Sequence, residues 1–509
     1  MVLHLYSATL NGMNGLCIDV EVDLSAGLPN LVIVGMGDTA IRESRERIRS
    51  SMKSFGYKFP SKRMVINLAP ASLKKEGALY DLAMTLGLLH ASDQISLQNY
   101  QDYGILGELS LDGLLRPVKG VLSMVIAMKK KGLKKAIVPY LNRKEAAVVK
   151  GIDIFPVKTL ADAILLMTNK SQLHPYIFSE KDESHEVKKL YPDFKDVKGQ
   201  PFVKRALEIA ASGGHNLLMV GAPGTGKSML AKRFSGILPK MNFEESLECT
   251  QIQSIMGILK KDKLVRDRPF RSPHHSISYV GLVGGGKDPR PGEISMAHNG
   301  VLFLDELPEF NRSVLEVLRQ PLEDDQVTIA RASGSITFPS QIILIAAMNP
   351  CPCGFLTDEK KACHCTSSQI QKYRAKISGP LLDRIDLHVQ VPSVSFEAIS
   401  QKSEEESSSD IRARVESVRK IQEEKLSSSS SRVNAHMADA EIEKYCSCEK
   451  DVLKVLKKVI EDLGFSARAY TKLLKVSRTI ADMEKKEKIS VEHVLEAVQY
   501  RGLDRPIFS

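Results

Sequence analysis

The sequence predicts an α/β protein whose central part folds as a doubly wound parallel sheet around a phosphate-binding loop. Three observations support this expectation. An apolar run leads directly into the glycine-rich segment 221–228, whose letters are GAPGTGKS. A second apolar run, 301–304, ends in two adjacent carboxylates, Asp305 and Glu306. A third apolar run follows at 341–347, and helical patterns separate the three, as parallel strands joined by crossover helices require.

At 509 residues the chain is too long for one hydrophobic core, and we expect three domains. Short β-rich runs alternate with helical patterns over 1–165, which indicates an N-terminal α/β domain. The polar stretch 166–199 is typical of a linker, and 200–395 holds the nucleotide site. Leu and Val at helical spacing predict a C-terminal helical lid over 396–509, interrupted by serine-rich inserts.

Composition indicates the cellular location of the protein and the class of partner that it binds. Because the chain has neither a long apolar run nor a basic and apolar leader, we expect no membrane partner and a cytoplasmic location. The formal net charge of +10 mildly favours a polyanionic partner such as nucleic acid. Four of the eight cysteines crowd into 351–365, which suits a reducing compartment and a metal site rather than disulfides.

The segment 221–228 matches the phosphate-loop pattern G-x-x-x-x-G-K-S/T. Its glycines let backbone N–H groups close around phosphate oxygens, and the following helix start adds partial positive charge. Lys227 would reach the β- and γ-phosphates of ATP, and Ser228 would ligate Mg²⁺. The predicted nucleotide-binding residues are Gly221, Ala222, Pro223, Gly224, Thr225, Gly226, Lys227 and Ser228.

The two carboxylates after the second strand complete the predicted site. Asp305 would hold the Mg²⁺ shell, and Glu306 would polarise the attacking water as a general base. A strand that ends in acidic residues is common by itself. Here, however, the acidic strand lies downstream of a phosphate loop. A chance match of 221–228 to the phosphate-loop pattern is therefore the weaker interpretation.

These motifs, with several other segments, resemble the AAA+ ATPases related to the magnesium-chelatase motor subunit. More closely, the chain resembles the YifB/ComM group of bacterial competence proteins, and the resemblance extends over nearly its whole length. It implies ATP and Mg²⁺ as cofactors and a homohexameric ring. The segments that carry it are 221–228, 301–310, 347–354, 271–276 (RSPHHS), 284–286, 289–295 and 378–388 (SGPLLDRIDLH).

The resemblance assigns roles to three further residues. Asn349 would be the sensor that contacts the γ-phosphate or the attacking water. Arg384 would be an arginine finger supplied to a neighbouring subunit, where a guanidinium neutralises charge on the transferred phosphoryl group; the alternative is a salt bridge to Asp383 or Asp386. Arg468 would be the second sensor arginine, carried by the lid.

The segment 281–295 resembles a hairpin that reaches toward the pore of the ring. Its glycine-rich backbone and two cations, Lys287 and Arg290, suit contact with a phosphate chain. The alternative is a plain surface loop. The adjacent histidines His274 and His275 are more often structural than ligands, and we assign them no role.

The N-terminal segments 67–82 and 104–144 resemble the Lon-type protease fold. Proteolysis there requires a serine nucleophile and a lysine base. Laid along the family pattern, these two positions fall at Leu79 and Leu122, which cannot perform the chemistry. We therefore expect a Lon-like scaffold without protease activity, used for assembly or for DNA contact.

The crowded cysteines form two C-x-C pairs, Cys351 with Cys353 and Cys363 with Cys365. Four thiolates at this spacing can close a tetrahedral Zn²⁺ site, with His364 as a substitute for one of them. The alternative is four reduced thiols in a surface loop. A third pair, Cys446 and Cys448, suits plain packing.

The leading hypothesis from sequence is an ATP-driven DNA translocase or branch-migration helicase. It would act on single-stranded or branched DNA during recombination of incoming DNA, with recombination proteins as further partners. One rival is a metal-insertion motor of the chelatase type, although the Asp-x-Ser-x-Ser loop of its partner domain is missing from this sequence. The other rival is a protein-remodelling AAA+ ATPase that binds no DNA.

Overall fold

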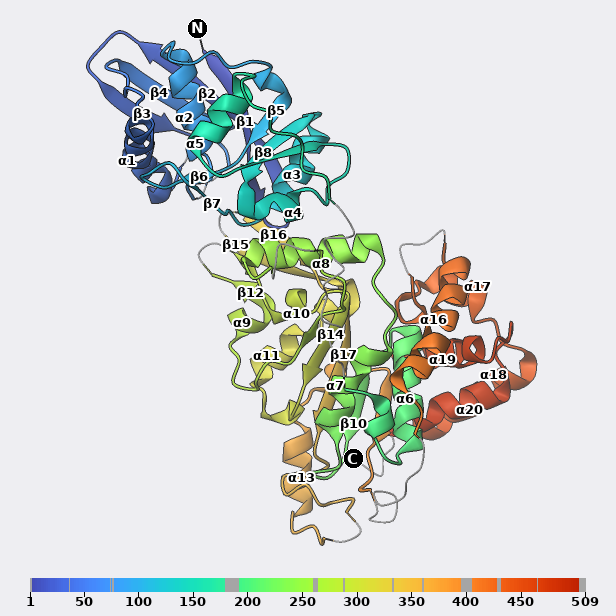
Figure 1. The fold of residues 1–509 in the computed structure, drawn as a ribbon. Helices are drawn as coiled ribbons and strands as arrows, with labels where there is room; N and C mark the ends of the chain where they lie inside the picture. Colours follow the sequence, from blue (N-terminus) through green and yellow to red (C-terminus); the bar gives the residue numbers. More distant parts are fainter. Residues whose placement is uncertain are drawn as a thin grey trace. The chain divides into compact units, whose positions relative to one another are not determined.

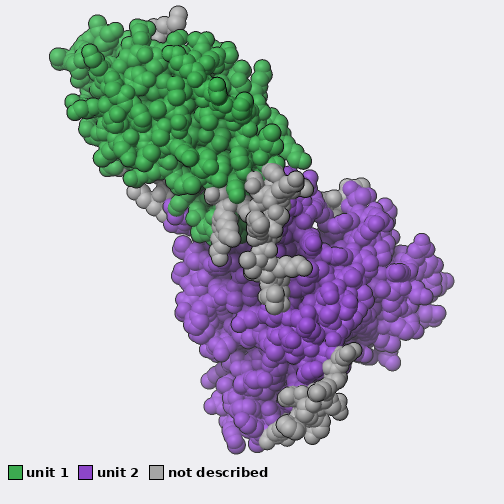
Figure 2. All heavy atoms as spheres, in the orientation of Figure 1, with its two compact units in different colours: residues 1–187, 246–265 green, residues 188–245, 266–509 purple. Residues whose placement is uncertain are grey.

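The structure is a computed structural model, and it divides the chain into two compact units (Figure 2). The N-terminal unit comprises 1–187 and 246–265, and the C-terminal unit comprises 188–245 and 266–509. The sequence placed 246–265 inside the nucleotide-binding core, whereas the structure groups this segment with the N-terminal unit. The described residues are 2–35, 37–73, 75, 77–178, 192–259, 264–286, 289–331, 334–358, 361–394, 405–427, 432–464 and 466–502.

A seven-stranded mixed sheet forms the N-terminal unit, in the order β3-β4-β2-β1-β5-β8-β9 (Figure 1). β1 pairs antiparallel with β2, and β2 with β4, whereas the remaining neighbours are parallel. Leu3 and Leu5 of β1 face the core because alternate residues of a strand point to the same side. The strands are β1 (Leu3–Asn11), β2 (Asn14–Ser25), β3 (Asn30–Val34), β4 (Arg63–Ala69), β5 (Tyr103–Ile105), β8 (Lys135–Pro139) and β9 (Asp153–Val157), with a separate small pair β6 (Glu108–Leu109) and β7 (Leu115–Arg116).

Helices cover this sheet, and one of them is buried all round. α2 (Asp81–Ala91) is apolar on every face, and its side chains are buried from Asp81 to Leu89, as expected for a helix enclosed by the core. It packs against β1, β2 and α1, while α3 packs against β1 and β2. The other helices of the unit are α1 (Thr39–Ser54), α3 (Val121–Lys130), α4 (Arg143–Ala146) and α5 (Leu160–Met167).

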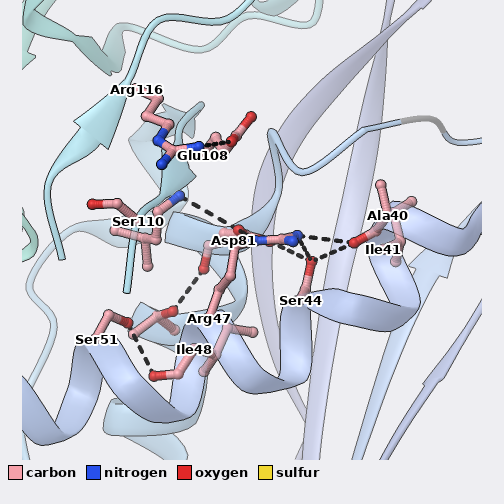
Figure 3. Close-up of polar contacts among 12 residues, drawn as sticks. Ala40, Ile41, Ser44, Arg47, Ile48, Ser51, Asp81, Glu108, Ser110 and Arg116 are labelled. Carbon is pink, nitrogen blue, oxygen red and sulfur yellow. Dashed lines mark hydrogen bonds and ion pairs between the residues drawn. The ribbon is translucent and has the colours of Figure 1, made fainter. Parts of the chain in front are cut away.

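A buried carboxylate joins α1 to α2 (Figure 3). Asp81 is fully buried, and it accepts a 2.6 Å hydrogen bond from Nε of Arg47 and another from the hydroxyl of Ser44. The backbone N–H of Leu109 donates a third, at 3.4 Å. Burial raises the pKa of Asp81 to about 6, although Arg47 and Ser44 act in the opposite direction. A buried charge of this kind is retained only when it is paired, so the contact fixes how the two helices meet.

The C-terminal unit contains the predicted parallel sheet, in the order β11-β14-β17-β10-β18 (Figure 1). All neighbours are parallel, and β10 lies between β17 and β18. In such sheets ligands bind at the carboxyl ends of the strands, beside the point where strand order reverses. The strands are β10 (Leu217–Val220), β11 (Phe270–Arg271), β14 (Gly300–Leu304), β17 (Ile342–Met348) and β18 (Leu387–Gln390).

Helices and two small hairpins surround this sheet. β12 (Gly284–Gly285) pairs with β13 (Arg290–Pro291), and β15 (Gln326–Arg331) pairs with β16 (Gly334–Pro339). The helices of this part are α6 (Pro201–Gly213), α7 (Lys227–Ile237), α9 (Tyr279–Val283), α10 (Glu293–Met296), α11 (Arg312–Val317), α12 (Pro321–Asp324), α13 (Ser367–Arg374) and α14 (Gly379–Leu382); α8 (Phe243–Met256) runs from this unit into 246–265.

The C-terminal lid is helical, as predicted, and it shares one hydrophobic core with the sheet. Leu473 and Ile480 of α19 lie in the same buried cluster as Leu207 of α6 and Phe234 of α7. The lid helices are α16 (Ser408–Lys425), α17 (Asp439–Tyr445), α18 (Lys450–Leu463), α19 (Ala467–Met483) and α20 (Val491–Gln499). Within the described ranges, no helix is both long enough and apolar enough to cross a membrane.

A buried ionic contact also joins the lid to the sheet. Asp386, just before β18, accepts a hydrogen bond from the ammonium of Lys472 on α19 and a 2.9 Å bond from the backbone N–H of Asn216. The ring of His215 lies 3.6 Å from the same carboxylate. Burial alone would raise the pKa of Asp386, but Lys472 and His215 outweigh burial and hold this pKa well below its usual range.

Candidate nucleotide-binding site

The phosphate loop connects β10 to α7 and has the backbone that its glycines predict. Gly224 and Gly226 adopt φ angles of 81° and 91°, which side chains with a Cβ disfavour. A Cβ on Gly221 would lie 2.5 Å from the carbonyl oxygen of Val391, so this position also excludes larger residues. These glycines therefore allow a tight turn. The turn leads directly into the N-terminus of α7, a helix of 11 residues.

A cavity of about 370 Å³ lies over this loop, within the size range of small-molecule sites. The lining combines the phosphate loop with the ends of β14 and β17, as the sequence predicted. Gly221, Ala222 and Thr225 lie behind the lining and are buried, and the Thr225 hydroxyl donates to the carbonyl of Ala222. The lining residues are Pro223, Gly224, Gly226, Lys227, Ser228, Met229, Asp305, Glu306, Met348 and Asn349.

Lys227 lines this cavity. Its Nζ donates to the carbonyl oxygens of Gly221 at 2.7 Å and Ala222 at 2.9 Å, and to Oδ1 of Asn349 at 3.3 Å. Burial lowers the pKa of Lys227, while Asp305 and Glu306 oppose that change. The ammonium is thus held by neutral oxygens that a phosphate oxygen can replace.

Ser228 and Asp305 meet at the position predicted for Mg²⁺. The Ser228 hydroxyl donates to Oδ2 of Asp305 at 2.5 Å, and Oδ1 of Asp305 accepts the backbone N–H of Glu306 at 3.0 Å. Hydroxyl and carboxylate oxygens are the ligands that Mg²⁺ prefers, and the ion usually takes one or two protein groups together with substrate phosphates. The pair fits that ion.

Glu306 follows β14 with a left-handed backbone (φ 52°) and a side chain that is 58% exposed. The Nδ1 atom of His275 lies 3.4 Å from its Oε2. The ring of His275 in turn stacks near His274, with centroids 4.0 Å apart, and meets the edge of Phe310. Sequence reasoning assigned no role to either histidine, because a His-His pair in a loop has no spacing that indicates one.

Arg384 and Arg468 lie outside the lining of this cavity. Arg384 donates from Nε to the carbonyl of Arg319 at 3.0 Å, from Nη1 to that of Pro380 at 2.8 Å, and from Nη2 to the carboxylate of Glu323. Arg468 donates from Nη2 to the other oxygen of Glu323 at 3.0 Å. The structure therefore brings the two predicted arginines together, on a carboxylate that the sequence did not single out.

Arg384 forms an ion pair within its own chain, but not with either of the two partners suggested as the alternative to an arginine finger. The carboxylate bound to Arg384 belongs to Glu323 rather than to Asp383 or Asp386. Asp386 is instead bound to Lys472. Glu323 could not be found from sequence, since 61 residues separate it from Arg384 and no periodicity relates the two.

The predicted hairpin of 281–295 takes the form of the short β12–β13 pair. Arg271 anchors its base through hydrogen bonds of 2.5 and 2.6 Å to Glu293. Arg290 is exposed, and Lys287 lies outside the described residues. The longer β15–β16 hairpin was missed, although the alternation in 326–331 (QVTIAR) and 334–339 (GSITFP) is the signal that predicts it.

The four predicted cysteine ligands converge on one point. Their Sγ atoms all lie within 4.8 Å of one another, so the cluster could hold a metal ion. Cys351 is fully buried, and the other three are partly exposed. The cluster follows Asn349 directly and therefore lies close to the nucleotide cavity along the chain.

Comparison with known proteins now identifies the family. The chain is 42% identical to the protein YifB of Salmonella typhimurium over 495 residues, which is 97% of this chain and 96% of that protein. It is 40% identical over 503 residues to the competence protein ComM of Haemophilus influenzae, covering 98% and 97% of the two chains. The chain belongs to the YifB/ComM family of magnesium-chelatase-like AAA+ ATPases. Models for the magnesium chelatase subunit ChlI match residues 193–399 and 20–142, and one for its C-terminal part matches 405–501.

This YifB/ComM family member also carries the Lon-like fold predicted for its N-terminus. It is 27% identical to Lon protease 2 of Bacillus subtilis over 192 residues, 34% of each chain. Leu79 and Leu122, the positions predicted to replace the protease dyad, both pack into hydrophobic clusters, and Leu122 is fully buried. The side chains at these two positions contribute to the core.

Proposed function

We propose that this AAA+ ATPase is a DNA motor: a homohexameric branch-migration helicase or translocase that assists recombination of incoming DNA during natural transformation. The observation that carries the motor is the convergence of Lys227, Ser228, Asp305, Glu306 and Asn349 on one cavity. The relationship to a competence protein supports the DNA part of the proposal. The expected setting is the cytoplasm, together with recombination proteins.

The five converging polar residues each have a place in the proposed ATP hydrolysis. The Lys227 ammonium exchanges the carbonyls of Gly221 and Ala222 for the β- and γ-phosphate oxygens. Ser228 and Asp305 would hold Mg²⁺, which would neutralise charge on the phosphates. Glu306 accepts the proton of the attacking water, and Asn349 orients that water or the γ-phosphate. These roles are consistent with the 2.5 Å contact between Ser228 and Asp305.

His275 is a positioning residue in this scheme. Its Nδ1 lies 3.4 Å from the Glu306 carboxylate, which is otherwise largely exposed. A carboxylate that acts as a base must be held within reach of its water, and an imidazole braced by Phe310 restricts its motion. The contact therefore supports Glu306 as the general base.

The location of Arg384 and Arg468 supports the proposed hexameric ring of subunits. Arg384 lies outside the cavity of its own chain, and three of its N–H groups bind Glu323 and two carbonyls. A guanidinium held this rigidly presents its remaining donors in a fixed direction. In the proposed hexamer those donors, with help from Arg468, complete the nucleotide site of the neighbouring chain.

The proposed DNA path uses the two hairpins and the net positive charge of the chain. Strand β13 carries exposed Arg290, and the protein has a formal charge of +10. Contacts to phosphates supply most of the affinity of sequence-independent binding. The proposed cofactors are ATP, Mg²⁺ and a structural Zn²⁺ in the four-cysteine cluster.

The deciding experiment measures ATP turnover and junction migration by the full-length protein. We expect single-stranded DNA and a synthetic Holliday junction to raise ATP turnover, with binding that weakens steeply as salt increases. Lys227→Ala should abolish turnover and migration together. Lys232→Ala is the matched control, because Lys232 is an exposed lysine on the same helix.

Two results would overturn the proposal. Migration that persists in Lys227→Ala would separate the movement of DNA from ATP hydrolysis. ATP turnover that ignores every DNA form, with no salt-dependent binding, would favour a protein-remodelling or chelatase-type motor instead.

A further inference from the structure

The four cysteines after β17 have the geometry of a metal site. Sγ of Cys351 lies 3.4 Å from that of Cys353 and 3.7 Å from that of Cys363, and the Cys353–Cys363 separation is 3.6 Å. In a tetrahedral zinc site with Zn–S bonds of ~2.3 Å, neighbouring sulfurs lie ~3.8 Å apart. These three separations are close to that value, and all four sulfurs lie within 4.8 Å of one another.

Backbone N–H groups also point at these sulfurs. The N–H of Cys353 donates to Sγ of Cys365 at 3.4 Å, and the N–H of Cys365 donates to Sγ of Cys363 at 3.5 Å. Such outer hydrogen bonds orient metal ligands and stabilise negative charge on them. Backbone donors therefore point at the sulfurs of Cys363 and Cys365, as they do around metal ligands.

The cluster is built against the phosphate loop. Gly354, inside the first cysteine turn, has φ 85°, and a Cβ there would lie 2.5 Å from Cδ of Pro223 and 3.8 Å from Cγ of Asn349. Its N–H donates to the carbonyl of Cys351 at 3.0 Å. The turn that carries two of the sulfurs thus packs directly on the ring of Pro223, with no room for a side chain at position 354.

A second connection runs through α13, which begins directly after the last cysteine. Thr366 caps this helix with a capping box, and Arg374 at its end returns to the carbonyl of Pro350 with bonds of 3.3 and 3.2 Å. Pro350 lies between Asn349 and Cys351. The segment from Asn349 to Arg374 is therefore a closed loop whose two ends meet beside the nucleotide cavity.

We propose that Cys351, Cys353, Cys363 and Cys365 bind one structural Zn²⁺, and that this ion holds Asn349 and Pro223 in the conformation that binds and hydrolyses nucleotide. The second half rests on the proposed ATPase role of the cavity. Zn²⁺ suits four thiolates in a closed tetrahedral site. Without the ion, the thiolates repel one another, the turn at 351–354 opens, and the contacts of Gly354 and Asn349 with the phosphate loop are lost.

The first test measures the metal. Full-length protein purified without chelator should contain about one zinc per chain by mass spectrometry, as a single closed site requires. Cys353→Ser should lose this zinc, whereas Cys448→Ser should keep it. Cys448 is the matched control because it is also the partly exposed second cysteine of a C-x-C pair. Protein with little zinc, or with another metal in its place, overturns the assignment.

The second test measures the coupling, without DNA. A mercurial reagent followed by excess thiol and chelator strips the metal from wild-type protein. Binding of a fluorescent ATP analogue and basal ATP turnover should then fall by about 10- to 100-fold, the effect of a small misplacement of catalytic groups. Addition of zinc should restore both. Unchanged nucleotide binding and turnover in protein shown to be metal-free overturns the coupling.

These readouts separate this inference from the DNA proposal. Metal content and nucleotide affinity do not depend on any DNA substrate, so a failure of DNA stimulation leaves them interpretable. If Cys353→Ser does not fold, stripping and reloading the wild-type protein still decides the question. Circular dichroism before and after stripping confirms that the change is local.

Discussion

Arg384 and Glu323 are bound to each other within one chain, although 61 residues separate them. Arg468, from the lid, binds the other oxygen of the same carboxylate. The pairing lowers the pKa of Glu323, because the two arginines outweigh the opposing effect of burial. Glu323 therefore stays ionised and determines the position of two cations that come from different parts of the C-terminal unit.

The first prediction concerns Arg384 and the proposed sharing of the nucleotide site between neighbouring chains. Arg384→Ala should lower ATP turnover by about 10³-fold or more, the usual contribution of an arginine finger, while nucleotide binding persists. Mixing this variant with Lys227→Ala should restore part of the turnover, since some interfaces then pair an intact phosphate loop with an intact arginine. Turnover in the mixture that equals the sum of the two inactive proteins would argue against sharing between chains.

The second prediction concerns Glu323 itself. Glu323→Gln keeps the shape of the side chain but removes the charge that holds Arg384 and Arg468. We expect turnover to fall by about tenfold, less than for the loss of Arg384, because charge-assisted hydrogen bonds are roughly twice as strong as neutral ones. Nucleotide affinity should change little. Asp324→Asn, at the exposed next residue, serves as the control, and an equal loss there would remove Glu323 from the mechanism.

The third prediction separates binding from chemistry at Glu306. Glu306→Gln should retain ATP and Mg²⁺ but lower the hydrolysis rate by about 10²- to 10⁴-fold, the usual contribution of a general base. His275→Gln should give a smaller loss in the same step, because His275 contacts Glu306 and does not line the cavity. Equilibrium nucleotide binding together with single-turnover hydrolysis measures both. Hydrolysis at the wild-type rate in Glu306→Gln would assign the base to another group.

Most of the residues predicted for the nucleotide site line one cavity, and the sequence could indicate them because the parts of that prediction are local. A glycine-rich turn between a strand and a helix needs only a few adjacent residues, and Asp305 and Glu306 follow directly from a buried strand. The cysteine cluster could be predicted for the same reason, since two short pairs define it. In each case the residues of the motif are close in the sequence and remain close after folding.

The features that sequence reasoning missed depend on contacts between distant segments. Glu323 lies on a four-residue helix with no pattern of its own, and its role appears only when Arg384 and Arg468 arrive from elsewhere. The same holds for Asp386, which was considered only as a partner of Arg384 but binds Lys472 of the lid. Such pairs form only when distant segments meet in the folded unit, and single-sequence periodicity does not contain that information.

The last prediction is that the two units respond to acid in opposite directions. Burial, aided by the charges of Arg501 and Lys472, lowers the pKa of His388 well below its usual 6.5; burial also lowers the pKa of His215, against the effect of Asp386. The unfolded chain therefore binds protons that the folded C-terminal unit does not. The two histidines therefore leave the C-terminal unit at full stability above pH ~6.5. Below that pH, each histidine lowers the free energy of unfolding by up to ~1.4 kcal/mol per pH unit.

In the N-terminal unit, burial raises the pKa of Asp81 from 3.8 to about 6. Folding there takes up a proton, so this contribution is greatest below pH ~4 and is lost as the pH rises through ~6. Hydrogen exchange of strand amides in each unit between pH 7 and 5, corrected for intrinsic rates, measures both effects. His388→Gln should flatten the slope of the C-terminal unit alone, and Asp81→Asn that of the N-terminal unit alone. Parallel slopes in the two units would contradict the assignment of these buried groups.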